Sequence, residues 1–263
     1  TFELLHAKGV RLEQKPIAVG VRVEHPAEII NQMRYGNKYK NFSGIGAATY
    51  SLNYTDRKMG RGVYTFCMCP GGEVINASSE PSLLAINGMS YSRRASVFSN
   101  AAIIATCQTG DYGSGGPLAG IAFQKAIEQK AFRAGGGGYA VPAQNLLDFL
   151  GKKNSGRLNV NSCATGTVAA DMREIFPAFI CDALATAFAT WEKTYPTFVS
   201  SDALLLGAET RTSSPVRITR SEKYESVSIR NLYPIGEGSG YTGGITSSAA
   251  DAIKAVERVM TFL

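Results

Sequence analysis

The sequence is low in charge and poor in tryptophan and histidine, and it lacks any apolar run long enough to cross a membrane. Charged residues make up 18% of the 263 residues, and 44% are hydrophobic. Such a composition supplies a packed core and excludes a disordered chain or a coiled coil. No stretch approaches the ~20 consecutive apolar residues of a transmembrane helix, and no signal-peptide pattern is visible. We therefore expect a cytoplasmic protein without a membrane partner.

Neither the charge nor the cysteine content points to nucleic acid or to a metal. The formal net charge is +6, but the basic residues are scattered rather than interleaved with aromatic side chains, so we expect no nucleic-acid partner. Five cysteines without a secretory signal favour reduced thiols. Cys67 and Cys69 are the only close pair, and a second pair at zinc-ligand spacing is missing. We expect no metal, and the two thiols also fit small apolar side chains on a strand.

Short segments rich in β-branched residues, separated by turn residues, dominate the first 110 residues. This pattern is typical of an antiparallel sheet or a small β-barrel. Helical periodicity begins at Leu118 and stops at the glycines 135–138. The expected strands are 16–23, 47–54, 62–68, 73–77, 83–88, 101–107, 208–219 and 226–235, and further helices are expected at 145–150, 168–176, 180–191 and from Ile245 onward.

This order of elements predicts an α+β fold with an inserted helical subdomain. We place a β-rich substrate domain at 1–110, a helical insert at 111–200 and a return strand of the β-rich domain at 201–225. A strand–turn–helix follows at 226–263, and it would complete the sheet of a nucleotide-binding domain.

The C-terminal segment is the most informative stretch of the chain. Five glycines between 236 and 244 separate the last expected strand from the closing helix. Such a turn presents free backbone N–H groups and a positive helix end to an anion or a polar ring. Residues 238–243 also match G-x-G-x-x-G, but a self-contained NAD site needs a further strand after the helix, which this sequence does not supply. We therefore expect no saturable NADH binding at this motif.

Five segments together resemble one protein family. Segment 233–245 (YPIGEGSGYTGGI) looks like the C-terminal flavin-binding segment of the uncharacterised FAD-dependent dehydrogenases, also called NAD/FAD-utilising dehydrogenases. Segments 15–26, 60–72, 87–90 and 209–217 match that family in the same order, so that the resemblance covers almost the whole chain.

The resemblance implies part of a flavin-dependent oxidoreductase. Members carry a first G-x-G-x-x-G in an N-terminal FAD-binding half, so this chain is expected to be the C-terminal portion, a fragment that binds FAD poorly and is inactive alone. The implied architecture is a barrel-like domain with a helical insert over the flavin, and a C-terminal strand–helix that belongs to a Rossmann-like domain. FAD is the implied cofactor of hydride transfer, NAD(P)H is a candidate hydride donor, and the substrate is an unknown small molecule.

The resemblance also assigns cofactor-binding roles in the glycine turn. Glu237 would accept a hydrogen bond from a ribityl or ribose hydroxyl, although a carboxylate near a helix N-terminus also fits a solvated turn. The residues that begin the helix would face the pyrimidine edge of the flavin. The implied cofactor-binding set is Gly236, Glu237, Gly238, Gly243, Gly244 and Ile245.

Two polar segments supply the substrate-side candidates. They carry polar or polarisable side chains where a purely structural strand would prefer Val and Ile. Arg211 could hold a carboxylate or phosphate through two hydrogen bonds, or form an ordinary surface ion pair. His25 is an acid–base candidate that also fits a structural histidine. The substrate-side set is Cys67, Met68, Cys69, Arg211, Thr212 and Ser213, and the catalytic residue is left unassigned.

A non-enzymatic interpretation stays open beside the flavoenzyme. A β-barrel with helices could serve as a binding module for nucleic acid or a protein. That hypothesis predicts salt-sensitive binding to oligonucleotides, which the scattered charges disfavour.

Overall fold

The protein divides into two compact units that are interleaved along the chain. A computed structural model describes residues 1–42 and 44–261, so the last two residues of the expected segment 226–263 lie outside it. Unit 1 comprises Thr1–Ala18, Cys107–Lys125 and Arg211–Leu263, and unit 2 comprises Val19–Thr106 and Ala126–Thr210. Each unit is therefore assembled from segments that lie far apart in the sequence.

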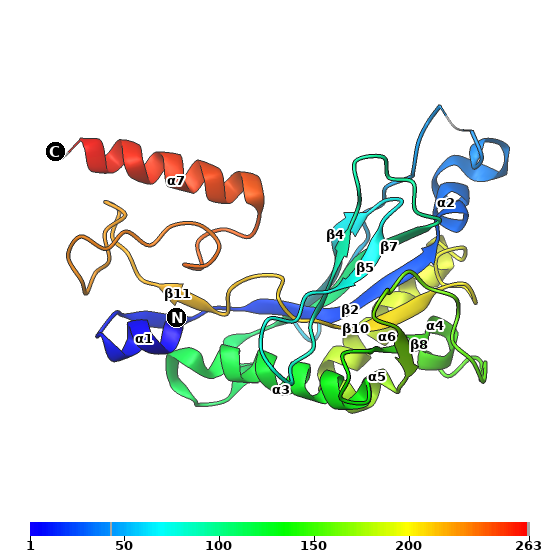
Figure 1. Ribbon diagram of the computed structural model, residues 1–263, viewed down its shortest axis with the longest axis horizontal. Helices are drawn as coiled ribbons and strands as arrows, with labels where there is room; N and C mark the ends of the chain where they lie inside the picture. The colour runs from blue at the N-terminus through cyan, green and yellow to red at the C-terminus, as the bar shows by residue number, and fades with distance from the viewer. Residues whose placement is uncertain (43, 262–263) are drawn as a thin grey trace. The chain divides into compact units, whose positions relative to one another are not determined.

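Unit 2 is built on an open sheet (Figure 1). Among the described residues, the sheet has seven strands in the order β3-β4-β7-β2-β10-β8-β9. The β3–β4, β4–β7, β2–β10 and β10–β8 pairs are antiparallel, whereas β8–β9 is parallel. The strands are β2 (Ile17–Pro26), β3 (Asn53–Asp56), β4 (Arg61–Cys69), β7 (Phe98–Cys107), β8 (Val141–Asn145), β9 (Thr167–Ala169) and β10 (Leu204–Glu209). The α+β class is thus confirmed, and the sheet does not close into a barrel.

The core of unit 2 lies where helices cover this sheet. Strands β2 and β7 are buried along almost their whole length, as expected for central strands rich in Val, Ile and Ala. Helix α6 packs against β3 and β4, where the indole N–H of Trp191 donates to the Asn53 carbonyl at 3.1 Å. A hairpin of β5 (Glu73–Asn76) and β6 (Ile86–Met89) adds a second, antiparallel sheet. The helices are α2 (Ala27–Tyr39), α4 (Leu146–Phe149), α5 (Met172–Ile175) and α6 (Ala178–Thr194).

Unit 1 is smaller and is built around one antiparallel strand pair. Strands β1 (Leu12–Gln14) and β11 (Val216–Ile218) pair along their whole length, and their apolar side chains form a small core with Val10, Phe2 and Leu232. The other elements are α1 (Phe2–Ala7), η1 (Thr109–Tyr112), η2 (Gly116–Leu118), the first half of α3 (Ala119–Ala134), and α7 (Ile245–Met260), drawn in red in Figure 1.

Several expectations about the elements were wrong, and two of them concern the helical insert and the C-terminal segment. The segment 111–200 is not all helical, because it contributes β8 and β9 to the sheet of unit 2. The expected strand 226–235 does not form: only an isolated bridge joins Ser226 to Arg220, while Tyr233 and Ile235 are exposed. Pro234 lacks the N–H group that a ladder requires, which explains this second failure. The assignment of a substrate domain, an insert and a FAD-binding segment stays a prediction.

Candidate functional site

The first half of the glycine turn before α7 is closed against β11. The Ser239 carbonyl accepts a hydrogen bond from the Ile218 N–H at 3.0 Å. A Cβ at Gly240 would lie only 2.4 Å from the Val216 carbonyl oxygen, and Gly240 has a φ of +83°, so this position requires glycine. The buried Gly236 has its N–H bonded to a carboxylate of α7. This half of the turn is therefore held in place by its own unit.

The second half of the turn is open. A Cβ at Gly243 would meet no atom within 4 Å, and one at Gly244 would meet only the Ser247 hydroxyl, at 3.6 Å. Gly244 is the N-cap of α7, no side chain caps the helix, and its first turn contains no acidic residue. Ile245 is 93% exposed. The helix thus presents backbone N–H groups and its positive end to open space, the geometry that suits an anion or a flat polar ring.

Two cations accompany Glu237 beside this turn. Lys15 directly follows β1, and Arg217 lies in β11. Burial lowers the pKa of Lys15, the charge of Arg217 lowers it further, and Glu237 raises it. The buried Nε of Arg217 has no hydrogen-bond partner within the described part of the chain. Two mutually repelling, partly buried cations favour a negatively charged ligand at this place.

An ion pair fastens α7 to the turn. Arg220 donates two hydrogen bonds to Asp251 of α7, at 2.9 and 2.7 Å, and both side chains are about 10% exposed. The same carboxylate accepts the Gly236 N–H at 2.8 Å, and the Arg220 guanidinium stacks on Tyr241 at 3.7 Å. The hydrogen bond with Arg220 is the main cause that lowers the pKa of Asp251. The position of the open helix end therefore depends on this pair.

Unit 2 contains a separate polar centre around Arg22, whose side chain is fully buried. Its guanidinium makes two hydrogen bonds to Glu209, both at 3.0 Å. It also donates to the side-chain oxygens of Asn100 at 2.8 Å and Asn87 at 3.1 Å, and to the Cys67 carbonyl at 3.1 Å. These partners come from β10, β7, β6 and β4, so one arginine joins four strands to β2. A buried charge is tolerable only with such complete pairing.

The three predicted candidates of segment 60–72 lie at this centre. Strand β4 shifts register against β7 between Phe66 and Cys69, and within this bulge Cys67 has a φ of +41°. Bulges re-aim side chains, and a non-glycine residue in the left-handed region is uncommon. Cys67 is exposed, Met68 and Cys69 are partly buried, and the Cys69 Sγ lies 3.9 Å from a guanidinium nitrogen of Arg22.

Two buried polar atoms near Arg22 are unsatisfied. In the described part of the chain, the Asn100 amide nitrogen and the Tyr50 hydroxyl have no hydrogen-bond partner. Burial raises the pKa of Tyr50, the charge of Arg22 lowers it, and Cys69 raises it, so this hydroxyl is electrostatically coupled to both. Buried polar groups are rarely left unpaired, and these two offer hydrogen-bonding capacity for a ligand or a water molecule.

Glu24 lies two residues along β2 from Arg22, on the same face of the strand. It is 2% exposed and accepts hydrogen bonds from the backbone N–H of Ser162, at 2.8 Å, and from its hydroxyl. Burial raises the pKa of Glu24 to about 7, which outweighs the lowering by Ser162, and Glu73 raises it further. A carboxyl group with such a pKa is suited to proton transfer near neutral pH.

The other predicted candidates fall in the other unit or are fully buried. Arg211, Thr212 and Ser213 fall in unit 1, whereas Cys67, Met68 and Cys69 fall in unit 2. Thr212 is buried and donates its hydroxyl to the Ala18 carbonyl at 2.7 Å, a structural role. His25 is fully buried, its Nε2 lies 2.8 Å from the Phe198 carbonyl, and burial lowers its pKa to about 4. The imidazole is therefore neutral and inaccessible, which disfavours an acid–base role.

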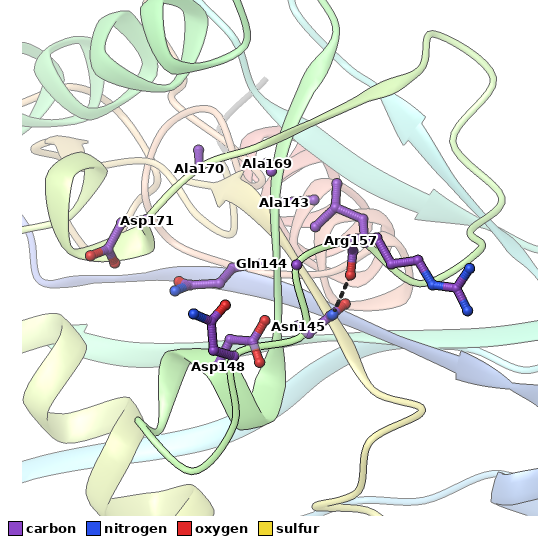
Figure 2. Close-up of a pocket in the computed structure, with 11 residues that line it drawn as sticks. Ala143, Gln144, Asn145, Asp148, Arg157, Ala169, Ala170 and Asp171 are labelled. Carbon is purple, nitrogen blue, oxygen red and sulfur yellow. Dashed lines mark hydrogen bonds between the residues drawn. The ribbon is translucent and has the colours of Figure 1, made fainter.

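The cavity shown in Figure 2 is less suited to a ligand than the glycine turn before α7 or the polar centre around Arg22. Its volume is about 370 Å³, and Gln144, Asn145, Asp148 and Arg157 line it. Asn145 donates to the Arg157 carbonyl at 2.9 Å, Asp148 accepts from Ser155, and the guanidinium of Arg157 points away from the other labelled side chains. Its polar groups are thus used for folding the loop 151–166.

The described residues contain no group of three or more His, Cys, Asp and Glu side chains that could hold a metal ion. Within the same residues, every helix is too short or too polar to span a membrane.

Sequence reasoning missed Lys15, Arg22, Glu24 and Asn100 as site residues. A signal existed for two of them: Arg22 and Glu24 are charged residues directly after a run of Val, Ile, Ala and Gly. Charges at such positions are rarely buried without a partner. Asn100 carried no comparable signal, because an asparagine in a strand also marks a turn or an edge.

Comparison with known proteins identifies the family. A family model described as "FAD-dependent protein, C-terminal domain-like" matches residues 16–212. An uncharacterised protein of Clostridium beijerinckii (strain ATCC 51743 / NCIMB 8052) is 41% identical over 262 residues, which are 99% of this chain and 49% of the relative. The chain therefore spans about half the length of the curated relative it matches. Because the family model covers most of the chain, this protein belongs to the FAD-dependent proteins that share this C-terminal domain.

Proposed function

We propose that the protein is part of a flavin-dependent oxidoreductase of the dehydrogenase type. In this proposal the chain supplies the substrate-side residues and one wall of the FAD site. The observation that carries it is the uncapped N-terminus of α7, which begins at open glycines beside the cations Lys15 and Arg217. Membership of an FAD-dependent family supports the cofactor.

The residues present fit a flavin at this place. Gly243 and Gly244 leave space above the backbone, so that a flat ring could approach their N–H groups closely. Gly236 and Gly238 belong to the turn, Glu237 would accept a hydrogen bond from a sugar hydroxyl, and Ile245 begins the helix whose positive end would face the ring. When bound, FAD supplies the hydride chemistry. The protein's own contribution is to hold the ring and to stabilise negative charge with the helix end and the two cations.

Substrate and electron donor belong to the same proposal. NAD(P)H is the candidate hydride donor, and the polar centre around Arg22 is the candidate substrate side. Glu24 would there hold or release a proton near neutral pH, and Arg22 would fix the bulge of β4 that carries the cysteines.

One observation favours a second candidate, a non-enzymatic docking module. Helix α7 exposes an apolar stripe, in which Ile253 is 59%, Val256 56% and Met260 70% exposed. Exposed stripes of this kind mark contacts with another domain or protein. A docking module would bind its partner equally well without FAD, whereas the flavoenzyme requires the cofactor.

The two cations give the test of the flavin site. We expect Lys15→Gln and Arg217→Gln each to lower the reduction potential of bound FAD by on the order of 30 mV, about a tenfold change in the two-electron equilibrium. The physical reason is that reduced flavin carries more negative charge than oxidised flavin, so losing a nearby cation disfavours it. Potentiometric titration of the FAD-loaded protein measures this.

The matched control is Arg11→Gln, because the Arg11 side chain is exposed and forms a surface ion pair with Glu13 at 3.3 Å. Its potential should equal that of the wild type. If the reduction potential of FAD is unchanged in both Lys15→Gln and Arg217→Gln, the flavin does not bind at this turn.

A further inference from the structure

The bulge of β4 brings one exposed and one partly buried thiol beside a buried guanidinium, that of Arg22. Cys67 is exposed and Cys69 partly buried, whereas Cys107, Cys163 and Cys181 are buried. The left-handed backbone at Cys67 breaks the regular ladder here. A purely structural strand has no need for such a conformation, which is strained for a residue other than glycine.

Arg22 provides the electrostatic environment. Its Nη1 lies 3.9 Å from the Cys69 Sγ and donates to the Cys67 carbonyl at 3.1 Å. Burial acts to lower the pKa of Arg22, but Glu209 raises it and both cysteines raise it as well, so guanidinium and thiols attract each other. A guanidinium at this distance can donate a hydrogen bond to the Cys69 sulfur during an exchange reaction, in which the thiolate is the reactive form of cysteine.

The geometry also allows the two thiols to react with one another. Residues two apart in an extended strand have Cα atoms roughly 6.6 Å apart, near the upper limit of what a disulfide spans, about 6.8 Å. The backbone at Cys67 is left-handed, with a φ of +41°, so this segment of β4 is not fully extended. The Cys69 Sγ already folds back to 3.5 Å from the Cys67 carbonyl.

The unsatisfied atoms supply recognition. The Asn100 amide nitrogen and the Tyr50 hydroxyl, both buried, have no partner among the described residues. Asn100 bonds Arg22 through its oxygen, and the Tyr50 hydroxyl is coupled to Arg22 and Cys69. They can hydrogen-bond a polar atom of a molecule that reaches Cys69.

We propose that Cys67 and Cys69 form a redox-active dithiol whose substrates are small disulfides. The Cys69 thiolate attacks one sulfur of the disulfide RSSR, forms a mixed disulfide and releases one RS⁻, which takes up a proton. The Cys67 thiol then loses its proton and attacks the Cys69 sulfur, which closes the Cys67–Cys69 disulfide and releases the second RS⁻. The protein is oxidised by two electrons and the disulfide is reduced to two thiols.

Reduction of the Cys67–Cys69 disulfide back to the dithiol takes two electrons and two protons. For this step the inference rests on the proposed function, in which the reduced flavin supplies the electrons. The exchange itself needs no flavin. It can therefore be tested independently, so that failure of the exchange and failure of FAD binding are distinguishable.

The experiment mixes the reduced, flavin-free protein with 2,2′-dithiodipyridine and follows thiopyridone release by absorbance, with peptide mass spectrometry to locate the products. The wild type should release two equivalents rapidly and yield a Cys67–Cys69 disulfide, followed by slow reaction of the buried cysteines. Cys67→Ser should release one rapid equivalent and accumulate a mixed disulfide at Cys69. Cys69→Ser should lose the intramolecular disulfide.

Arg22→Lys replaces the planar guanidinium and its several N–H donors with a single ammonium group. We expect it to slow the rapid release of thiopyridone by about tenfold. Because this variant could unfold, the Cys67→Ser result stands as the independent criterion. The proposal is overturned if Cys67 and Cys69 react no faster than the three buried cysteines, or if Cys67→Ser accumulates no mixed disulfide at Cys69.

Discussion

At the scale of single residues, the placement of charge inside β2 has the largest consequences. Arg22 is fully paired, so it holds four strands together at the cost of burying an ion. Glu24 lies two residues on; its carboxyl group accepts hydrogen bonds from Ser162 and has a raised pKa. The folded protein therefore prefers Glu24 protonated, whereas the unfolded chain does not.

This difference predicts how stability depends on pH. The ordinary pKa is 4.5 and the folded value about 7, so the unfolded state binds fewer protons between these values. The free energy of unfolding should consequently fall as pH rises from about 4.5 to about 7, by up to about 3 kcal/mol from this group. Glu24→Gln should remove that fall and raise stability at pH 8 relative to the wild type.

Urea unfolding at pH 5 and pH 8 measures the effect. Glu73→Gln is the control, since Glu73 contributes only a secondary share of the pKa shift of Glu24. If the wild type and Glu24→Gln show parallel pH profiles, the buried carboxyl is ionised in the folded state and the proton-transfer role loses its basis.

At the scale of elements, helices with a strong apolar period could be predicted, and strands formed by distant partners could not. The period of Ile180, Leu184 and Phe188 predicts α6, and the run from Ile245 predicts α7; both helices are confirmed. Strand β8 reads Val-Pro-Ala-Gln-Asn and has no strand pattern of its own. It is a strand because it pairs with β10 on one side and with β9 on the other. The pairing with β10 joins segments that lie some 60 residues apart in the sequence.

The anchoring of α7 gives a prediction at this scale. Asp251→Asn removes the charge that Arg220 and the Gly236 N–H share, and it leaves a mostly buried guanidinium without its counter-ion. We expect the amides of 245–260 to lose hydrogen-exchange protection corresponding to about 1.5–3 kcal/mol. Native-state hydrogen exchange with mass spectrometry resolves this helix from the rest of the chain.

Asp182→Asn is the matched control. Asp182 also pairs with an arginine, Arg173, at 3.1 Å, but the two side chains are 64% and 46% exposed. We therefore expect Asp182→Asn to lower the free energy of hydrogen-exchange protection by less than about 0.5 kcal/mol. Equal protection of α7 in the wild type and in Asp251→Asn would show that the Arg220–Asp251 ion pair does not hold the helix in place.

At the scale of the whole molecule, two features lay beyond sequence reasoning for the same reason. The interleaving of the two units and the assembly of the Arg22 centre both depend on contacts between segments far apart in the chain. Of the candidate site residues, Cys67, Met68 and Cys69 were found because their residue types are unusual for a strand. Glu209, Asn87 and Asn100 were not assigned to a site, since each acquires its role only from Arg22. The relative from Clostridium beijerinckii is about twice as long, so the reaction of the whole protein stays a proposal.

The central claim is that the open glycines before α7 face the flavin ring, and one substitution tests it directly. Gly243 has no atom within 4 Å of an added Cβ and no left-handed backbone, so Gly243→Leu should fold normally. Gly110, in the same unit and equally open, provides the control Gly110→Leu.

The measurement is the dissociation constant of FAD in the full-length protein, together with the unfolding midpoint of each variant. We predict that Gly243→Leu weakens FAD binding by at least about tenfold, roughly 1.4 kcal/mol, because the side chain occupies the space of the ring, while Gly110→Leu binds as the wild type does. Equal FAD affinity in all three proteins, with unchanged unfolding midpoints, would contradict the account.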